Sequence, residues 1–188
     1  MAFVELIPEQ EASGEVAELY ASERARLGSL PNFVTAFGAR PSVYAAWRQL
    51  IGELLATMDT RRFELVTLAA AQRLRSSYCS LAHGKALLEF MDAETLREVA
   101  TQPCPEALDG LDRALMALAA KVADDATSVT QTDVDELRSL GLADAEIVDV
   151  VFAAAARSFF SKALDGLGIQ PDATLAEAFE PSLRKVAI

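Results

Sequence analysis

The chain consists largely of alanine- and leucine-rich segments that glycine, proline or charged residues interrupt at short intervals. Alanine and leucine favour helices, whereas the aromatic and β-branched residues that favour strands are comparatively sparse. No alternating apolar and polar run is long enough to predict a strand. The pattern therefore predicts an all-α protein, in which Gly28 and Gly141 end helices and Pro41 begins one.

The apolar periodicity and the stop signals divide the chain into a series of predicted helices. They cover about residues 9–27, 33–37, 41–56, 60–75, 76–90, 92–101, 107–125, 132–140 and 144–167. No low-complexity linker separates these segments. We therefore expect one helical domain over residues 1–188, long enough to bury a single large core.

The charge balance limits the partners that the protein can have. Seventeen basic and 28 acidic residues give a formal net charge of −11, so we expect neither nucleic acid nor an anionic membrane surface as a partner. The apolar stretches are shorter than the roughly 18–20 residues needed to cross a bilayer. The N-terminus shows no signal-peptide pattern, and we expect a cytoplasmic protein.

The chain has two cysteines, Cys79 and Cys104, and a single histidine, His83. These residues make neither a disulfide framework nor a zinc-type cluster, so we expect no metal and no other cofactor. His83 follows Cys79 by four residues, which places both side chains on one face of a helix, about 5–6 Å apart at Cβ. A base beside a thiol produces the nucleophilic thiolate, so the pair is a candidate for catalysis.

Glu64 is the candidate third member of this group. It lies in an otherwise apolar run near the start of the preceding predicted helix. A carboxylate on an adjacent helix can orient an imidazole and accept its proton. Ser76 precedes Cys79 by three residues and shares its helical face, while Tyr78 lies directly before it, so both are candidates for lining the site.

The pattern Glu64, Ser76-x-x-Cys79 and His83 resembles the AhpD-like alkylhydroperoxidase and carboxymuconolactone decarboxylase family. Members carry a glutamate, a Cys-x-x-Cys pair and a histidine at this spacing, here within residues 41–90. Other segments resemble the peroxidase-related branch of the family over nearly the whole chain: Gly28-x-Leu30-Pro31-Asn32-Phe33, Ala39-Arg40-Pro41, Arg62-x-Glu64-Leu65 and the stretch from Asp133 to Ile147. The resemblance implies an AhpD-like multihelical bundle that assembles as a homo-oligomer, such as a dimer, trimer or hexamer.

The resemblance also implies the reduction of hydroperoxides by a thiol. Cys79 would then be the peroxidatic residue, His83 the general base and Glu64 part of the proton relay. In the family the first cysteine of the motif resolves the oxidised second cysteine as a disulfide, but here that position is Ser76. A hydroxyl cannot form a disulfide, so the resolving thiol would be Cys104, a small-molecule thiol or a partner protein.

Two other functions remain open at this point. The first is a lyase similar to the carboxymuconolactone decarboxylases, which do not need the cysteine pair. Such an enzyme acts on an anionic lactone and would need basic residues in its pocket. The second is a non-catalytic helical oligomer with a degenerate site, acting as a redox sensor or a binding module.

One internal similarity suggests a duplication. Residues 64–79 and 146–161 align without gaps at an offset of 82, which pairs Glu64 with Glu146. We interpret this as a duplicated helical unit about a pseudo-twofold axis, with its second copy at about residues 143–168, although two apolar helices could share the pattern by chance. Only the first copy has a thiol, because Ser161 and Asp165 stand at the positions of Cys79 and His83.

The remaining notable side chains are interpreted structurally. The aromatic residues of the N-terminal part and of the long C-terminal helix are expected in the core or in a subunit interface rather than against a ligand: Tyr20, Phe33, Phe37, Tyr44, Trp47, Phe159 and Phe160. Arg157 lies in an apolar helix, where it would either pair with an acid across an interface or extend its guanidinium group to the surface.

Overall fold

A computed structural model describes residues 2–102 and 105–177 of the chain. Within these ranges the chain is helical and has no strand, as the sequence predicts. The helices are α1 (Glu15–Leu27), α2 (Asn32–Ala36), α3 (Pro41–Thr57), α4 (Thr60–Arg73), α5 (Ser77–Leu87), α6 (Ala93–Thr101), α7 (Gly110–Asp125), α8 (Gln131–Ser139), α9 (Asp144–Gly166) and α10 (Ala173–Glu177), with 3₁₀ turns at Glu9–Glu11 and Ala126–Ser128.

Most of the helix boundaries follow from the local signals in the sequence. Gly28 and Gly141 end α1 and α8 in the left-handed conformation, at φ values of 78° and 101°, which glycine adopts without steric cost. The predicted helix over residues 9–27 is wrong in one respect. It is divided between the first 3₁₀ turn and α1, because Gly14 has a φ of 54° and a ψ of −133°, which no helix can contain.

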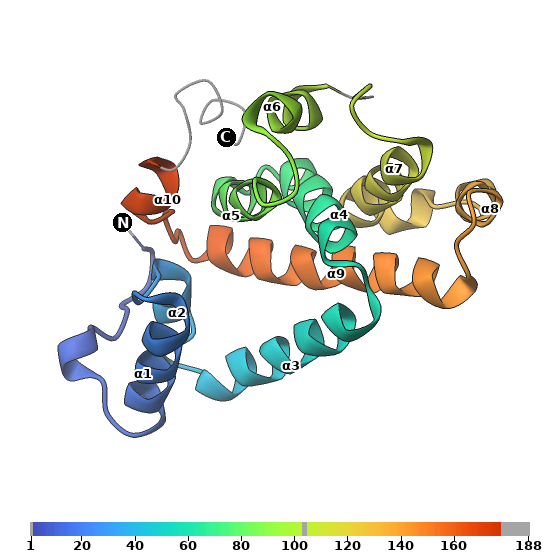
Figure 1. Cartoon of the computed structure of the whole chain (residues 1–188). Coiled ribbons are helices and arrows are strands. Elements are labelled where there is room, and N and C mark those ends of the chain that lie inside the picture. Colours follow the sequence, from blue (N-terminus) through green and yellow to red (C-terminus); the bar gives the residue numbers. More distant parts are fainter. Residues whose placement is uncertain (1, 103–104, 178–188) are drawn as a thin grey trace.

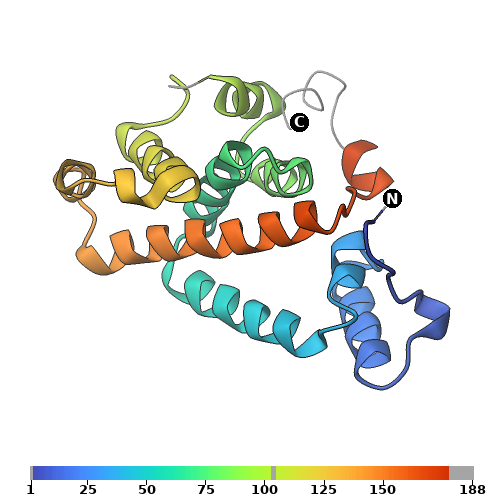
Figure 2. The ribbon, with the colours of Figure 1, turned by 180° about the vertical axis from the view of Figure 1, so that it is seen from behind.

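Helix α4 lies at the centre of the molecule and packs against α5, α7 and α9, while α3 packs along α9 (Figure 1). Seen from behind, the long helix α9, in orange, runs across the molecule above α3 (Figure 2). Buried aliphatic residues such as Val66, Leu115 and Val150 fill the space between α4, α7 and α9. This packing produces a rigid central layer on which the other helices rest.

A second cluster of buried residues is rich in aromatic side chains. Tyr20, Phe37, Tyr44 and Phe160 belong to it, and they come from α1, the end of α2, α3 and α9. The cluster also includes Cys79 on α5. The N-terminal helices therefore contribute to the buried surroundings of the thiol.

The chain breaks sharply between α4 and α5, close to the boundary that the sequence predicts at Arg75. Arg75 has a φ of 57°, the one positive φ of a non-glycine residue in the described part of the chain. The break allows α5 to pack back against α4. In one continuous helix, residues 19 positions apart would lie about 28 Å apart, whereas here Glu64 and His83 are in contact.

None of the helices in the described residues is long and apolar enough to cross a membrane.

Candidate thiol site

Cys79 lies in the first turn of α5 and is only 1% exposed. It is a free thiol. The guanidinium group of Arg157, on α9, donates a hydrogen bond from Nη1 to Cys79 Sγ over 3.5 Å. The packing of α9 therefore places a positive charge directly beside the sulfur. Cys104 lies outside the described residues, and its predicted role as a resolving thiol stays a prediction.

His83 lies one turn after Cys79 and is held by α4. Its Nδ1 is 2.6 Å from Glu64 Oε2 and 3.0 Å from Thr67 Oγ1. A carboxylate only accepts hydrogen bonds, so Nδ1 carries the proton in this pair and Nε2 keeps a free lone pair. The structure thus brings Glu64 and His83 together in the arrangement in which a carboxylate orients a histidine base.

The surroundings of His83 favour its neutral form. Burial lowers the pKa of His83 below its usual value, and the positive charge of Arg157 lowers it further, while the hydrogen bond and charge of Glu64 act in the opposite direction. A histidine with a lowered pKa is neutral at pH 7 and able to accept a proton. Its electrostatic environment therefore suits a general base.

Cys79 and His83 both line a cavity of about 290 Å³. No direct hydrogen bond joins the two side chains in the described part of the chain, so a proton would pass between them through a water molecule or through the substrate. Aromatic rings form much of the cavity wall: Phe33, Tyr44, Trp47, Tyr78 and Phe160. The expected core placement is confirmed for Tyr44 and Phe160, and these rings also line the cavity.

The two residues expected to line the site behave differently. Tyr78 lines the cavity; its hydroxyl donates a hydrogen bond to Asp172 and accepts one from the backbone N–H of Phe33. Burial and the neighbouring carboxylate of Asp172 raise the pKa of Tyr78, so it remains a protonated donor. Ser76 is fully buried at the start of α5 and does not line the cavity. Its hydroxyl has no hydrogen-bond partner among the described residues.

Arg157 is the residue whose place in the site the sequence did not reveal. It neither extends to the surface nor pairs with an acid in the described residues, since it is only 5% exposed and none of their carboxylates lies within 4 Å of it. The guanidinium carbon instead lies 5.7 Å from the ring centre of Trp47 and 5.2 Å from that of Phe160. The one feature of the sequence that could have indicated this role is that Arg157 is an isolated charge in an otherwise apolar stretch of helix.

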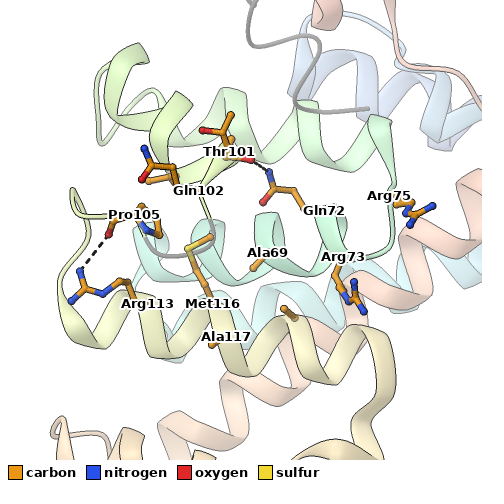
Figure 3. Close-up of a pocket in the computed structure, with 13 residues that line it drawn as sticks. Ala69, Gln72, Arg73, Arg75, Thr101, Gln102, Pro105, Arg113, Met116 and Ala117 are labelled. Carbon is orange, nitrogen blue, oxygen red and sulfur yellow. Dashed lines mark hydrogen bonds between the residues drawn. The ribbon is translucent and has the colours of Figure 1, made fainter.

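A second cavity, of about 600 Å³, lies away from the thiol between α4, α6 and α7 (Figure 3). Gln72, Arg73 and Arg113 are among its lining residues, and the hydrogen bonds of Gln72 and Arg113 to backbone carbonyls tie its walls together. We assign the chemistry of Cys79 to the smaller cavity, which Cys79 and His83 both line. Within residues 2–102 and 105–177, no group of histidine, cysteine or acidic side chains is placed to hold a metal ion.

Comparison with known proteins identifies the fold. No family model matches the chain, and no curated protein matches it. Among solved structures, an AhpD-core, peroxidase-related protein from Ralstonia eutropha JMP134 matches with a TM-score of 0.81 and 18% identity over 93% of this chain and 94% of that one. A peroxidase-related protein from Silicibacter sp. TM1040 matches with a TM-score of 0.76 and 18% identity, over 92% and 90% of the two chains.

A third similar structure is that of a debrominase with a bound brominated pyrrole. It is a cysteine-to-alanine variant of the debrominase Bmp8 in complex with 2,3,4-tribromopyrrole, with a TM-score of 0.77 and 14% identity over 99% of this chain and all of that one. At these identities the similarity establishes the fold. The chain has the all-α AhpD-like fold, as its motif predicts, and proteins of this fold include both peroxidase-related proteins and a debrominase.

Proposed function

We propose that this protein is a thiol-dependent oxidoreductase that reduces hydroperoxides through Cys79. The observation that carries the proposal is the arrangement around one cavity of a buried free thiol, an arginine that contacts its sulfur, and a neutral histidine oriented by a carboxylate. These are the parts that a nucleophilic thiol needs: a base, a group that orients the base, and a positive charge beside the thiolate.

The chemistry begins when His83 takes the proton of Cys79. The thiolate sulfur attacks the terminal oxygen of the hydroperoxide, an S–O bond forms, and the O–O bond breaks. The departing alkoxide takes the proton from His83 and leaves as an alcohol, while Cys79 is oxidised to the sulfenic acid. Glu64 stabilises the imidazolium that exists between these two proton transfers.

The sulfenic acid must then be resolved by a thiol outside the motif, because Ser76 is the neighbour in the resolving position. One external monothiol condenses with the sulfenic acid and releases water. A second monothiol reduces the resulting mixed disulfide, which restores Cys79 and releases the oxidised reductant as a disulfide. A monothiol reductant therefore suffices, and Cys104 or a partner protein is the other source of the resolving thiol.

The test is peroxide consumption with a monothiol reductant, using the parent chain, Cys79→Ser and Ser161→Ala. We expect Cys79→Ser to lose turnover. Ser161 occupies the position aligned with Cys79 and is fully buried with an unpartnered hydroxyl, so Ser161→Ala is the matched control and should retain full activity. Turnover by Cys79→Ser equal to that of the parent would overturn the proposal.

Reductive dehalogenation of an aromatic compound is a second candidate. It is favoured by the similarity to the debrominase and by the aromatic wall of the cavity. In this reaction the ring carbon is first protonated, and the Cys79 thiolate then takes the halogen as the carbon–halogen bond breaks and a sulfur–halogen bond forms. A reducing thiol attacks that sulfur, which releases halide and leaves a mixed disulfide, and a second thiol reduces the disulfide and restores Cys79. The test is bromide release from a brominated pyrrole in the presence of a thiol. Release that depends on Cys79, without peroxide turnover, would favour this candidate over the first.

The lyase alternative also gains support from one observation. Three arginines line the cavity, Arg26, Arg48 and Arg157, and an enzyme that acts on an anionic lactone needs such basic residues. Lactone turnover that survives alkylation of Cys79 would favour the lyase. An absence of turnover across a panel of lactones would count against it.

The proposal includes assembly as a homo-oligomer. Large apolar side chains are exposed along α3 and α9: Val43, Leu50, Leu55, Val148, Phe152 and Phe159. Exposed apolar patches of this kind mark protein–protein contacts. Light scattering of the parent should give a mass above that of one chain, and Leu50→Asp with Phe159→Asp should reduce it. A monomeric parent chain would contradict this part of the proposal.

A further inference from the structure

The guanidinium group of Arg157 is a buried charge without a compensating acid in the described residues. Its hydrogen bond to Cys79 Sγ uses Nη1, and its Nε has no acceptor there. Buried charges are costly, and proteins generally pair them or use them at functional sites. The contacts of Arg157 with the rings of Trp47 and Phe160 supply only part of that compensation.

The other charges in the cavity do not neutralise Arg157. Arg26 and Arg48 lie at its edge, and both bind the buried carboxylate of Glu23, with Arg48 Nη1 2.6 Å from Glu23 Oε1 and Arg26 Nε 3.0 Å from Glu23 Oε2. Among the described residues, the ionisable side chains of the lining are these three arginines, Cys79, His83, Tyr44 and Tyr78, and none is an aspartate or a glutamate. In a chain with a net charge of −11, this cavity is a local site that attracts anions.

The size and the aromatic lining of the cavity favour a small ligand with an aromatic ring. Its volume of about 290 Å³ is at the lower end of the range of about 300–1,000 Å³ for small-molecule sites. Trp47 and Phe160 stack with ring centres 4.1 Å apart, and Phe33 and Tyr44 extend the aromatic wall. Trp47 Nε1 is a second buried donor without an acceptor in the described residues.

We infer that Arg157 is the anion-binding residue of this cavity and that the hydroperoxide substrate is a small aromatic carboxylate whose peroxide group faces Cys79. A guanidinium group binds a carboxylate through paired N–H donors, and the aromatic wall accommodates a single ring. The inference rests on the proposed function, since it names the substrate class of the same thiol site.

Two alkylating reagents of nearly equal size but different charge test the inference. Iodoacetate carries a carboxylate and iodoacetamide is neutral, and both modify the same sulfur. Peptide mass spectrometry measures the rate at which iodoacetate modifies Cys79, divided by the rate for iodoacetamide. This ratio is then divided by the same ratio for a small free thiol. Because both reagents attack the same sulfur, a change in the thiolate fraction cancels. We expect this normalised ratio to be about tenfold in the parent chain, which corresponds to about 1.4 kcal/mol of charge recognition.

Substitutions of two arginines test whether Arg157 causes the preference of Cys79 for iodoacetate. Arg157→Gln should bring the normalised ratio to about one, and Arg157→Lys should retain part of the preference. Arg73→Gln is the matched control, because Arg73 lines the other cavity (Figure 3), and it should behave as the parent. A ratio of about one in the parent, or an unchanged ratio in a folded Arg157→Gln, would overturn the inference.

The assigned ligand class, an aromatic carboxylate, has its own test in the parent chain, which needs no variant to fold. Benzoate should slow the alkylation of Cys79 by iodoacetamide, whereas the neutral benzamide at the same concentration should not. Equal protection by both compounds, or by neither, would overturn the assignment of an aromatic carboxylate. These results are independent of peroxide chemistry: a parent chain that shows the carboxylate preference but does not oxidise Cys79 with peroxide would refute the proposed function alone.

Discussion

The segment from α4 to α5 and the helix α9 share a sequence pattern at an offset of 82 residues but fold differently (Figure 1). The first breaks at Arg75, and the break lets Glu64 reach His83. The second is one continuous helix. There the aligned Glu146 accepts a hydrogen bond from the backbone N–H of Ala143, at the start of the helix. A glutamate at the same place in the pattern thus holds a histidine in one segment and caps a helix in the other.

The two segments also differ in where their arginines lie. Arg75 is exposed at the break, whereas Arg157 is buried and contacts the sulfur of Cys79. The continuous helix therefore contributes one charge to a site that the broken segment assembles. The comparison indicates that the break, rather than the residue pattern alone, distinguishes the segment with a thiol site from its counterpart. Paired substitutions at aligned positions can test this difference.

The largest expected difference is between the aligned positions His83 and Asp165. His83→Asn should reduce Cys79-dependent turnover by about 10²–10⁴-fold, the usual contribution of a general base. Asp165 is exposed, so Asp165→Asn should leave turnover unchanged. Steady-state kinetics with a hydroperoxide and a monothiol measures both. An equal loss in the two variants would show that the segments do not differ in the way proposed.

The next pair is Glu64 and Glu146. Glu64→Gln should reduce turnover by about 10–100-fold, because the amide orients His83 but cannot stabilise its protonated form. Glu146→Gln should keep its turnover and instead lose about 0.5–1 kcal/mol of stability, since it weakens a helix start. Kinetics and denaturant unfolding separate the two effects. Full activity in Glu64→Gln would remove Glu64 from the proton relay.

The pH dependence gives a smaller effect with a defined sign. Because the pKa of His83 is lowered, the acid limb of kcat/KM should lie below about pH 6.5, the usual value for histidine. Arg157→Gln removes a positive neighbour and should move the limb upward, whereas Glu64→Gln should move it downward. A pH–rate profile of each variant provides the measurement, and shifts in the reverse directions would contradict the assigned electrostatics.

The same lowered pKa makes a prediction for stability. The unfolded chain binds a proton at His83 near pH 6.5, while the folded chain binds it only at lower pH. The free energy of unfolding should therefore fall as the pH drops below about 6.5, by at most about 1.4 kcal/mol per pH unit from this residue. Subtracting the pH series of His83→Asn, measured by denaturant unfolding, isolates this contribution, and an absent difference would contradict it.

The smallest effect concerns the break itself. Arg75→Gly should stabilise the fold by about 0.5–1 kcal/mol, because relief of the left-handed strain exceeds the entropic cost of a glycine. Arg75→Ala keeps a Cβ and should give no such gain. At the aligned position, Arg157→Gly places glycine in the middle of a continuous helix and should destabilise. Thermal unfolding measures all three, and a loss of stability in Arg75→Gly would refute the assigned strain.

Much of the fold and part of the site could be predicted from the sequence. Local signals predict most helix boundaries, since a glycine stop or a proline start acts within a single turn. The shared face of Cys79 and His83 follows from their four-residue spacing. The contact of Glu64 with His83 required the two helices to pack against each other, and the family motif supplied that information.

The role of Arg157 could not be predicted in this way. Arg157 is 78 residues from Cys79 in the chain, and only the packing of α9 brings the two together. The aromatic wall was missed for the same physical reason, because a ring that packs against a core and a ring that lines a cavity have the same apolar sequence context. The break at Gly14 was missed because the helical pattern of the flanking residues continues across it.

The central claim is that Cys79 is a nucleophilic thiol that a hydroperoxide oxidises. The most direct measurement is peptide mass spectrometry of the parent chain after mild hydroperoxide treatment in the presence of a sulfenic-acid trapping reagent. The account predicts a trapped sulfenic acid at Cys79, and its loss in His83→Asn. An unmodified Cys79 under conditions that oxidise a small free thiol would contradict it.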